Sequence, residues 1–80
     1  MENFDQNNFQ HCVNRAISLI KNREAQMIEE GHEWPINTES CRWALEQAII
    51  NRSSNESMME AAIKYVESVE YRAEQFSGLV

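Results

Sequence analysis

The sequence predicts an all-α fold, a three-helix bundle whose helices run up, down and up. Apolar residues recur at steps of three and four along most of the chain, which is the spacing of one helix face. The 80 residues include only two glycines and one proline, too few for a turn-rich β fold. A chain of this length makes one domain, so we expect residues 1–80 to form a single helical unit.

The first helix is predicted at about residues 7–30. Its apolar face consists of Phe9, Val13, Ala16, Ile20 and Met27. Asp5, Asn7 or Asn8 is placed to cap its start, because a short side-chain acceptor satisfies the free amides of a first helical turn. Gly31 is expected to end the helix, since glycine takes a left-handed conformation without steric cost.

A shorter second helix is predicted at about residues 38–51. The proline after Trp34 prevents the first helix from continuing, and we expect Trp34 to cover one end of the bundle. Asn37 or Thr38 then caps the second helix.

The third helix is predicted at about residues 54–76. Ser53 and Glu56 match the capping box, in which each side chain accepts from the backbone amide of the other. A heptad-like seam follows, formed by Met59, Ala62, Val66, Val69, Ala73 and Phe76.

The predicted helix lengths are unequal, about 36 Å for the first and about 21 Å for the second. If the short helix lies between the two long ones, apolar residues at their ends stay bare. These are Phe9, Val13, Val69 and Phe76, followed by Leu79 and Val80. Because exposed apolar area of this kind marks an interface, we expect a homodimer that covers these residues.

The second helix has apolar residues on two sides. One stripe contains Cys41, Leu45, Ala48 and Ile49, and the other contains Trp43 and Ile50. Both stripes can be internal to a dimer core. Alternatively, Trp43 and Ile50 anchor a foreign protein, since tryptophan is enriched among the residues that dominate binding energy.

Four glutamates of the third segment project to one side at helical spacing. They are Glu56, Glu60, Glu67 and Glu74, with Tyr71 at their edge. The plain interpretation is a solvated face. A second interpretation is a surface for a basic partner, including mimicry of a nucleic-acid backbone by regularly spaced carboxylates.

No pattern in the sequence indicates catalysis, a cofactor or a metal. His11 and Cys12 are adjacent and point about 100° apart on a helix, so they cannot hold one ion together. Glycine-rich phosphate loops and zinc-binding spacings are lacking. We therefore expect a protein that is not an enzyme, with neither cofactor nor metal.

The net charge, the N-terminal residues and the cysteine count limit which partners and which cellular compartment we expect. Seven Lys and Arg against thirteen Asp and Glu give a net charge of −6, which disfavours direct binding to nucleic acid or to an anionic membrane. The acidic N-terminal residues do not form a secretory signal and two cysteines are too few for a disulfide framework, so we expect a cytoplasmic protein.

These features favour a protein–protein interaction module that regulates or inhibits a larger protein or complex, anchored by Trp43 and Ile50 with Trp34 and Tyr71 nearby. One alternative is an acidic mimic of nucleic acid, such as a phage-type inhibitor of a nuclease or of a defence complex. Another is a purely structural helical adaptor. Small acidic helical chains are common among accessory proteins of bacteria, phages and plasmids, which is an analogy of class only.

Overall fold

The computed structural model describes residues 4–77, and these form helices without any strand. The elements are α1 (Gln6–Glu29), α2 (Cys41–Ile50) and α3 (Met58–Ser77). The structure confirms the prediction of an all-α fold with two long helices and a shorter middle one. Leu79 and Val80, which we expected at the interface, lie outside the described residues.

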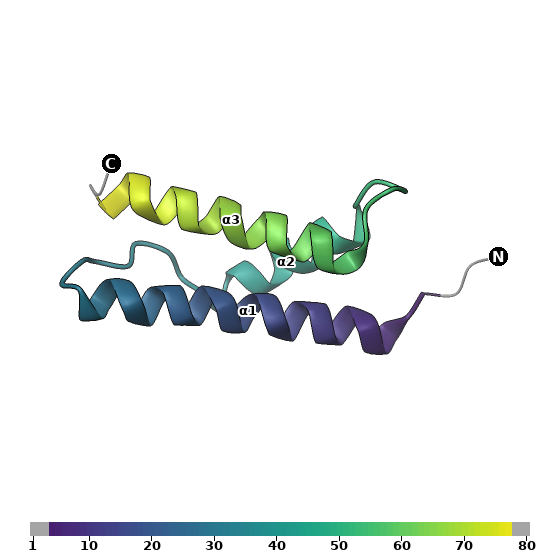
Figure 1. Cartoon of the computed structure of the whole chain (residues 1–80), viewed down its shortest axis with the longest axis horizontal. Helices are drawn as coiled ribbons and strands as arrows, with labels where there is room; N and C mark the ends of the chain where they lie inside the picture. The colour runs from purple at the N-terminus through teal and green to yellow at the C-terminus, as the bar shows by residue number, and fades with distance from the viewer. Residues whose placement is uncertain (1–3, 78–80) are drawn as a thin grey trace.

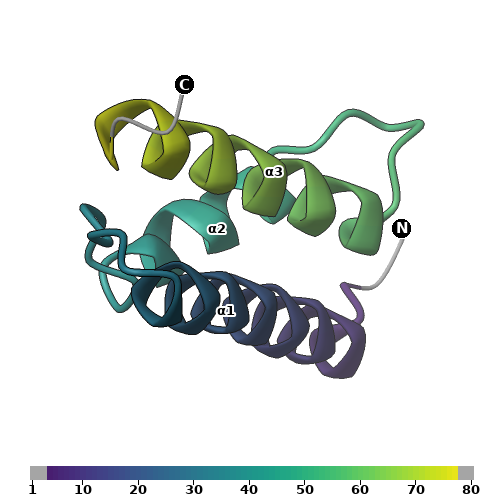
Figure 2. The same ribbon diagram turned by 60° about the vertical axis from the view of Figure 1, so that its left-hand side comes forward.

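The two long helices lie side by side and run in the same direction (Figure 1). Near their N-terminal ends the Asn8 Nδ2 atom lies 3.6 Å from Met58 Sδ, and near their C-terminal ends Arg23 Nη2 lies 3.1 Å from Glu74 Oε1. In the rotated view, α2 packs across one side of this pair (Figure 2). The result is an elongated molecule of 49 × 20 × 16 Å.

Helix α1 begins and ends where its local signals place it. The Asp5 carboxylate accepts a hydrogen bond from the Asn8 backbone N–H at 3.0 Å, so Asp5 is the cap among the three candidates. At the other end Gly31 has φ +88°, and the His32 N–H donates to the Met27 carbonyl at 2.9 Å. This is a Schellman termination, in which a left-handed residue lets following amides satisfy the last carbonyls.

Helix α2 begins three residues later than predicted. Residues 38–40 form a turn, in which the amides of Ser40, Cys41 and Arg42 donate to carbonyls three residues back, so α-helical geometry starts only at Cys41. Asn37 caps this turn, because its Oδ1 atom accepts from the Glu39 and Ser40 amides at 3.1 and 3.4 Å. Thr38, the other candidate cap, is buried.

Helix α3 begins four residues later than predicted, and its capping box is a different one. The Ser57 N–H donates to Glu60 Oε1 at 3.2 Å and the Glu60 N–H donates to Ser57 Oγ at 3.1 Å. The predicted pair, Ser53 and Glu56, precedes the helix. Both pairs fit the same motif, and a start at Met58 places this methionine and the alanines after it in the core.

The prediction that four apolar residues at the ends of the long helices stay bare was wrong for three of them. Phe9, Val13 and Val69 are 6%, 0% and 0% exposed within a single chain, whereas Phe76 is 73% exposed. The prediction assumed that α2 separates the long helices. Because α1 and α3 contact each other directly, their apolar faces cover one another beyond the reach of α2.

Candidate partner-binding surfaces

The outward side of α2 carries the most exposed tryptophan of the described residues. Trp43 is 70% exposed and Ile50 is 49% exposed, while Leu45 and Ile49 on the opposite side are fully buried. Gln47 lies between Trp43 and Ile50 along the helix, one turn from each. We call Trp43, Gln47 and Ile50 the α2 outer face.

The α2 outer face is uncharged along its centre. Its nearest acidic side chain on the helix, Glu46, lies at one flank because successive residues project about 100° apart. A rigid helix that presents an aromatic ring, a carboxamide and a branched aliphatic chain in a row is suited to contact with another helix or an apolar groove.

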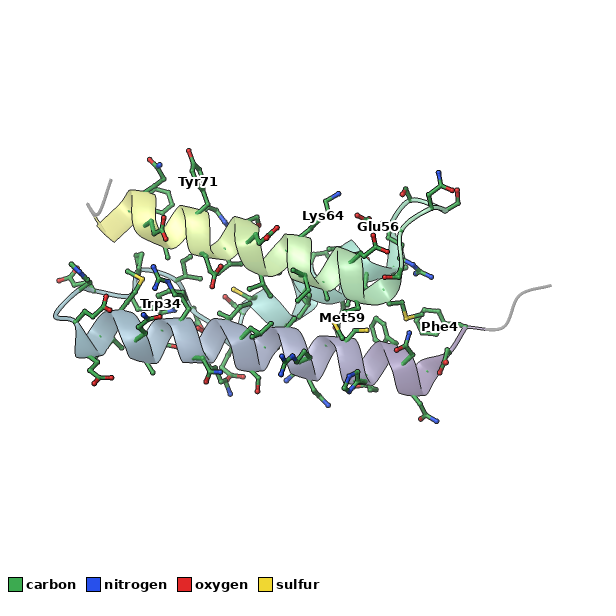
Figure 3. The ribbon with its side chains drawn as sticks, viewed as in Figure 1. Phe4, Trp34, Glu56, Met59, Lys64 and Tyr71 are labelled. Carbon is green, nitrogen blue, oxygen red and sulfur yellow. The ribbon has the colours of Figure 1, made fainter. Side chains whose placement is uncertain are left out.

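The four glutamates predicted to form a stripe do not act as one charged surface. Glu56 precedes α3, its side chain is only 17% exposed, and its Oε2 atom lies 3.0 Å from Lys64 Nζ. Glu74 pairs with Arg23 of α1 at 3.1 Å. Glu60 belongs to the capping box and Glu67 is exposed. Figure 3 shows Glu56 and Lys64 at the N-terminal end of α3.

The pKa of Glu60 is lowered from its usual value. The main cause is the hydrogen bond from the Ser57 backbone N–H, followed by the Ser57 side chain, and a minor contribution comes from Lys64. Glu60 therefore stabilises the start of α3 in its charged form.

The two aromatic residues predicted to assist Trp43 lie in different settings. Tyr71 is 63% exposed on α3 and points away from the other helices (Figure 3). Trp34 is half-buried against the core, and its Nε1–H donates to Thr38 Oγ1 at 3.0 Å. The Thr38 hydroxyl donates in turn to Glu24 Oε1 of α1 at 2.9 Å. Trp34 therefore holds the connection between α1 and α2 in place.

A shallow groove of about 510 Å³ lies between α1 and this connection. It is lined by Lys21, Glu24, Ala25, Ile28, Ile36, Asn37, Thr38 and Glu39. Lys21 and Glu39 form an ion pair of 3.2 Å at its edge, and Ile28 is 55% exposed. No pattern in the sequence predicts this groove, because it depends on how the connection folds back onto α1.

Arg52 is a structural residue that sequence reasoning missed. Its Nη1 atom donates to the Ile49 carbonyl at 3.0 Å and its Nε atom donates to the Glu56 carbonyl at 3.0 Å. One guanidinium thus closes the end of α2 and fixes the loop that leads to α3. The available signal was a basic residue directly after a helix, where it can bond to the last carbonyls.

The two thiols are free and buried. Burial raises the pKa of Cys12, and the nearby Arg52 opposes this effect only in part. Burial also raises the pKa of Tyr65, with a further contribution from the Cys41 thiol and an opposing one from Arg72. These shifts favour the uncharged forms, in which cysteine behaves as a small apolar residue.

Within residues 4–77, no three His, Cys, Asp or Glu side chains are grouped closely enough to hold a metal ion. The helices of this part of the chain are also too short or too polar to cross a membrane. Comparison of the chain with protein-family models, with curated proteins and with solved structures found no match.

Proposed function

We propose that this chain is a non-enzymatic protein–protein interaction module, a small regulator or inhibitor that docks onto a larger protein through the α2 outer face. The observation that carries the proposal is the exposure of Trp43, 70% of its surface, on a helix whose other side is fully packed. Tryptophan offers a large contact area at the cost of fixing only two side-chain torsions.

The rest of the fold supports this use of α2. Leu45 and Ile49 fix the rotation of the helix, and Arg52 fixes its C-terminal end, so the outer face is held rigidly. A pre-organised face loses little conformational entropy on binding. In this proposal an up-down-up bundle serves as the scaffold, and its location in the cytoplasm remains a prediction.

The charge of the chain favours a partner with a basic surface. A net charge of −6 speeds encounter with a positive partner and disfavours encounter with nucleic acid. Mimicry of nucleic acid receives less support, because Glu56 and Glu74 are in ion pairs and Glu60 caps a helix. A purely structural adaptor would not account for the exposed Trp43.

Affinity capture from native cells, with tagged wild-type and variant chains compared by quantitative mass spectrometry, tests the proposal. Trp43→Glu should lose a partner that wild type retains. Tyr71→Glu is the matched control, because it places the same charge at an exposed aromatic position on another helix. Far-UV circular dichroism verifies that both variants are folded.

A partner retained by Trp43→Glu as well as by wild type would show that the α2 outer face is not the docking surface. Glu67→Lys separates the mimicry alternative, since it reverses an exposed charge and leaves the capping box intact. Loss of capture in Glu67→Lys alone, together with competition by DNA or RNA, would favour mimicry over our proposal.

A further inference from the structure

We propose that the groove between α1 and the connection to α2 binds an extended segment of a partner protein, in which an arginine stands two positions from an aliphatic residue. This inference goes beyond the proposed function, because the groove is lined by residues other than those of the α2 outer face. Its test needs only the purified chain and a short peptide, so the outcome does not depend on capture of a partner.

The connection runs back along α1 in a fixed register. Lys21 of α1 and Glu39 form the ion pair of 3.2 Å at the edge of the groove. One turn later on α1, Glu24 accepts the hydrogen bond of 2.9 Å from Thr38. Later residues of α1 therefore lie beside earlier residues of the connection, and these two contacts mark the charged end of the groove.

The same register places two isoleucines at the other end of the groove. Four residues of α1 beyond Glu24 advance about 6 Å, and two residues of extended chain before Thr38 span about 6.6 Å. These steps lead to Ile28 and Ile36, which both line the groove. The groove thus has a charged end and an apolar end about 6–7 Å apart.

The charged end suits a guanidinium. Glu24 accepts from Thr38 through Oε1, and Lys21 approaches Glu39 at Oε1, so within residues 4–77 the Oε2 atom of each carboxylate has no hydrogen-bond donor. The two carboxylates project from opposite sides of the groove. A guanidinium presents five N–H donors in a planar fork and can bond to both at once, whereas an ammonium acts as a point charge. Because Lys21 and Glu39 are exposed, their ion pair is a weak competitor.

The separation of the two ends selects an extended segment. In an extended chain, residues two positions apart point to the same side and lie about 6.6 Å apart. An arginine and a leucine at this spacing reach the charged end and the isoleucines together, while the residue between them points to solvent. Ala25, between the two ends, leaves room for the methylene stem of the arginine.

The charge of the chain favours a cationic occupant. The lining of the groove carries two carboxylates and one ammonium, which leaves an excess of negative charge. The net charge of −6 attracts a basic segment from a distance and repels a second copy of this chain. Binding should therefore weaken as salt is added.

The fluorescence of Trp34 tests the proposal, because its Nε1–H donates to Thr38, which lines the groove. In the Trp43→Phe chain Trp34 is the only tryptophan. The probe is acetyl-Gly-Arg-Ala-Leu-Gly-amide. We expect a saturable change in emission with a Kd of roughly 0.1–1 mM that rises several-fold between about 50 and about 500 mM salt.

Two control peptides separate charge from spacing. One has glutamine in place of arginine, and the other has arginine and leucine adjacent to each other. Each should bind at least about fivefold more weakly than the probe, because the first lacks the cation and the second cannot reach both ends of the groove.

Matched variants locate the site in the same Trp43→Phe chain. Glu39→Gln should weaken binding by about fivefold or more, whereas Glu67→Gln makes the same charge change at an exposed position of α3 and should bind like its parent. Lys21→Met should bind about twofold or more tightly, because it removes the competing ammonium. Lys64→Met removes an equal charge from another ion pair and should leave the affinity unchanged.

Amide chemical shifts give a second measurement, with changes expected in residues 21–28 and 36–39. The inference is overturned if neither fluorescence nor shifts respond up to about 5 mM probe. Equal affinity for a control peptide, or for acetyl-arginine amide, would also refute it, since the groove would then take any apolar segment or any small cation. Absence of peptide binding together with Trp43-dependent capture would refute the groove alone, and the reverse result would refute the proposed function alone.

Discussion

Two adjacent isoleucines of α2 provide a direct test of which side of this helix faces outward. Ile49 is 0% exposed and Ile50 is 49% exposed, so Ile49→Ala and Ile50→Ala remove the same atoms from opposite environments. Because both positions lie in the last turn of the helix, the intrinsic helix preference changes equally. Any difference between the two variants therefore reports burial.

The expected losses differ severalfold. Truncation of a buried isoleucine to alanine costs about 2–5 kcal/mol, since it removes apolar contact and leaves a cavity. Removal of three carbon atoms is worth roughly 2.4 kcal/mol in transfer free energy. Because Ile50 is half-exposed, its truncation loses about half of this transfer free energy, ~1 kcal/mol. The higher helix propensity of alanine offsets about 0.4 kcal/mol of that loss.

These losses are large compared with the total stability. A chain of 80 residues is expected to unfold with a free energy of about 4–12 kcal/mol. At roughly 4–8 °C per kcal/mol, a loss of 3 kcal/mol lowers the melting temperature of Ile49→Ala by about 12–24 °C. Ile50→Ala should lower it by only a few degrees.

Thermal unfolding followed by far-UV circular dichroism measures both variants, at a protein concentration low enough to exclude self-association. Equal losses would mean that α2 is rotated about its axis by roughly 50°, and a greater loss in Ile50→Ala would mean a rotation of about one residue, or 100°. Trp43 would then no longer face outward, and the argument for the docking surface would fail with it.

Three further predictions concern stability. Ser57→Ala should lower the free energy of unfolding, measured by urea titration, by about 1 kcal/mol, while Ser53→Ala should leave it almost unchanged. Equal losses would show that Ser57 is not the capping residue of α3. Gly31→Ala should cost about 1 kcal/mol although nothing lies within 4 Å of an added Cβ atom, because φ is +88°. The raised pKa of Tyr65 gives stability that is present below pH ~10 and lost as the pH rises through the folded-state pKa. Tyr65→Phe should flatten this alkaline loss, and an unchanged pH profile would contradict the assignment.

The sequence was sufficient for features that depend on neighbouring residues. Asp5 and Gly31 mark the ends of α1 because a cap and a left-handed stop act within one turn. The opposite placement of Trp43 and Leu45 follows from their separation of two residues on a helix.

Choices between equivalent local signals required tertiary structure. Ser53 and Ser57 each stand three residues before a glutamate, and only the burial of Met58 selects the second. The direct contact of α1 with α3 was equally inaccessible, because heptad spacing identifies an apolar face and leaves its partner unspecified. For this reason the heptad spacing predicts Phe9, Val13 and Val69 at an interface, whereas the structure buries them in the core.

The side-by-side arrangement of the first and last helices also constrains how the molecule reaches its native state. The contacts between them join positions 50 and 51 residues apart, as in Asn8 with Met58 and Arg23 with Glu74. Bringing such distant positions together lowers the chain entropy before any stabilising contact forms. The entropy loss is smaller for α2 and α3, because only a short turn joins them. We therefore expect α2 and α3 to associate early and α1 to dock late. During synthesis on the ribosome, the apolar side of α1 cannot pack against α3 until residues 58–77 have emerged.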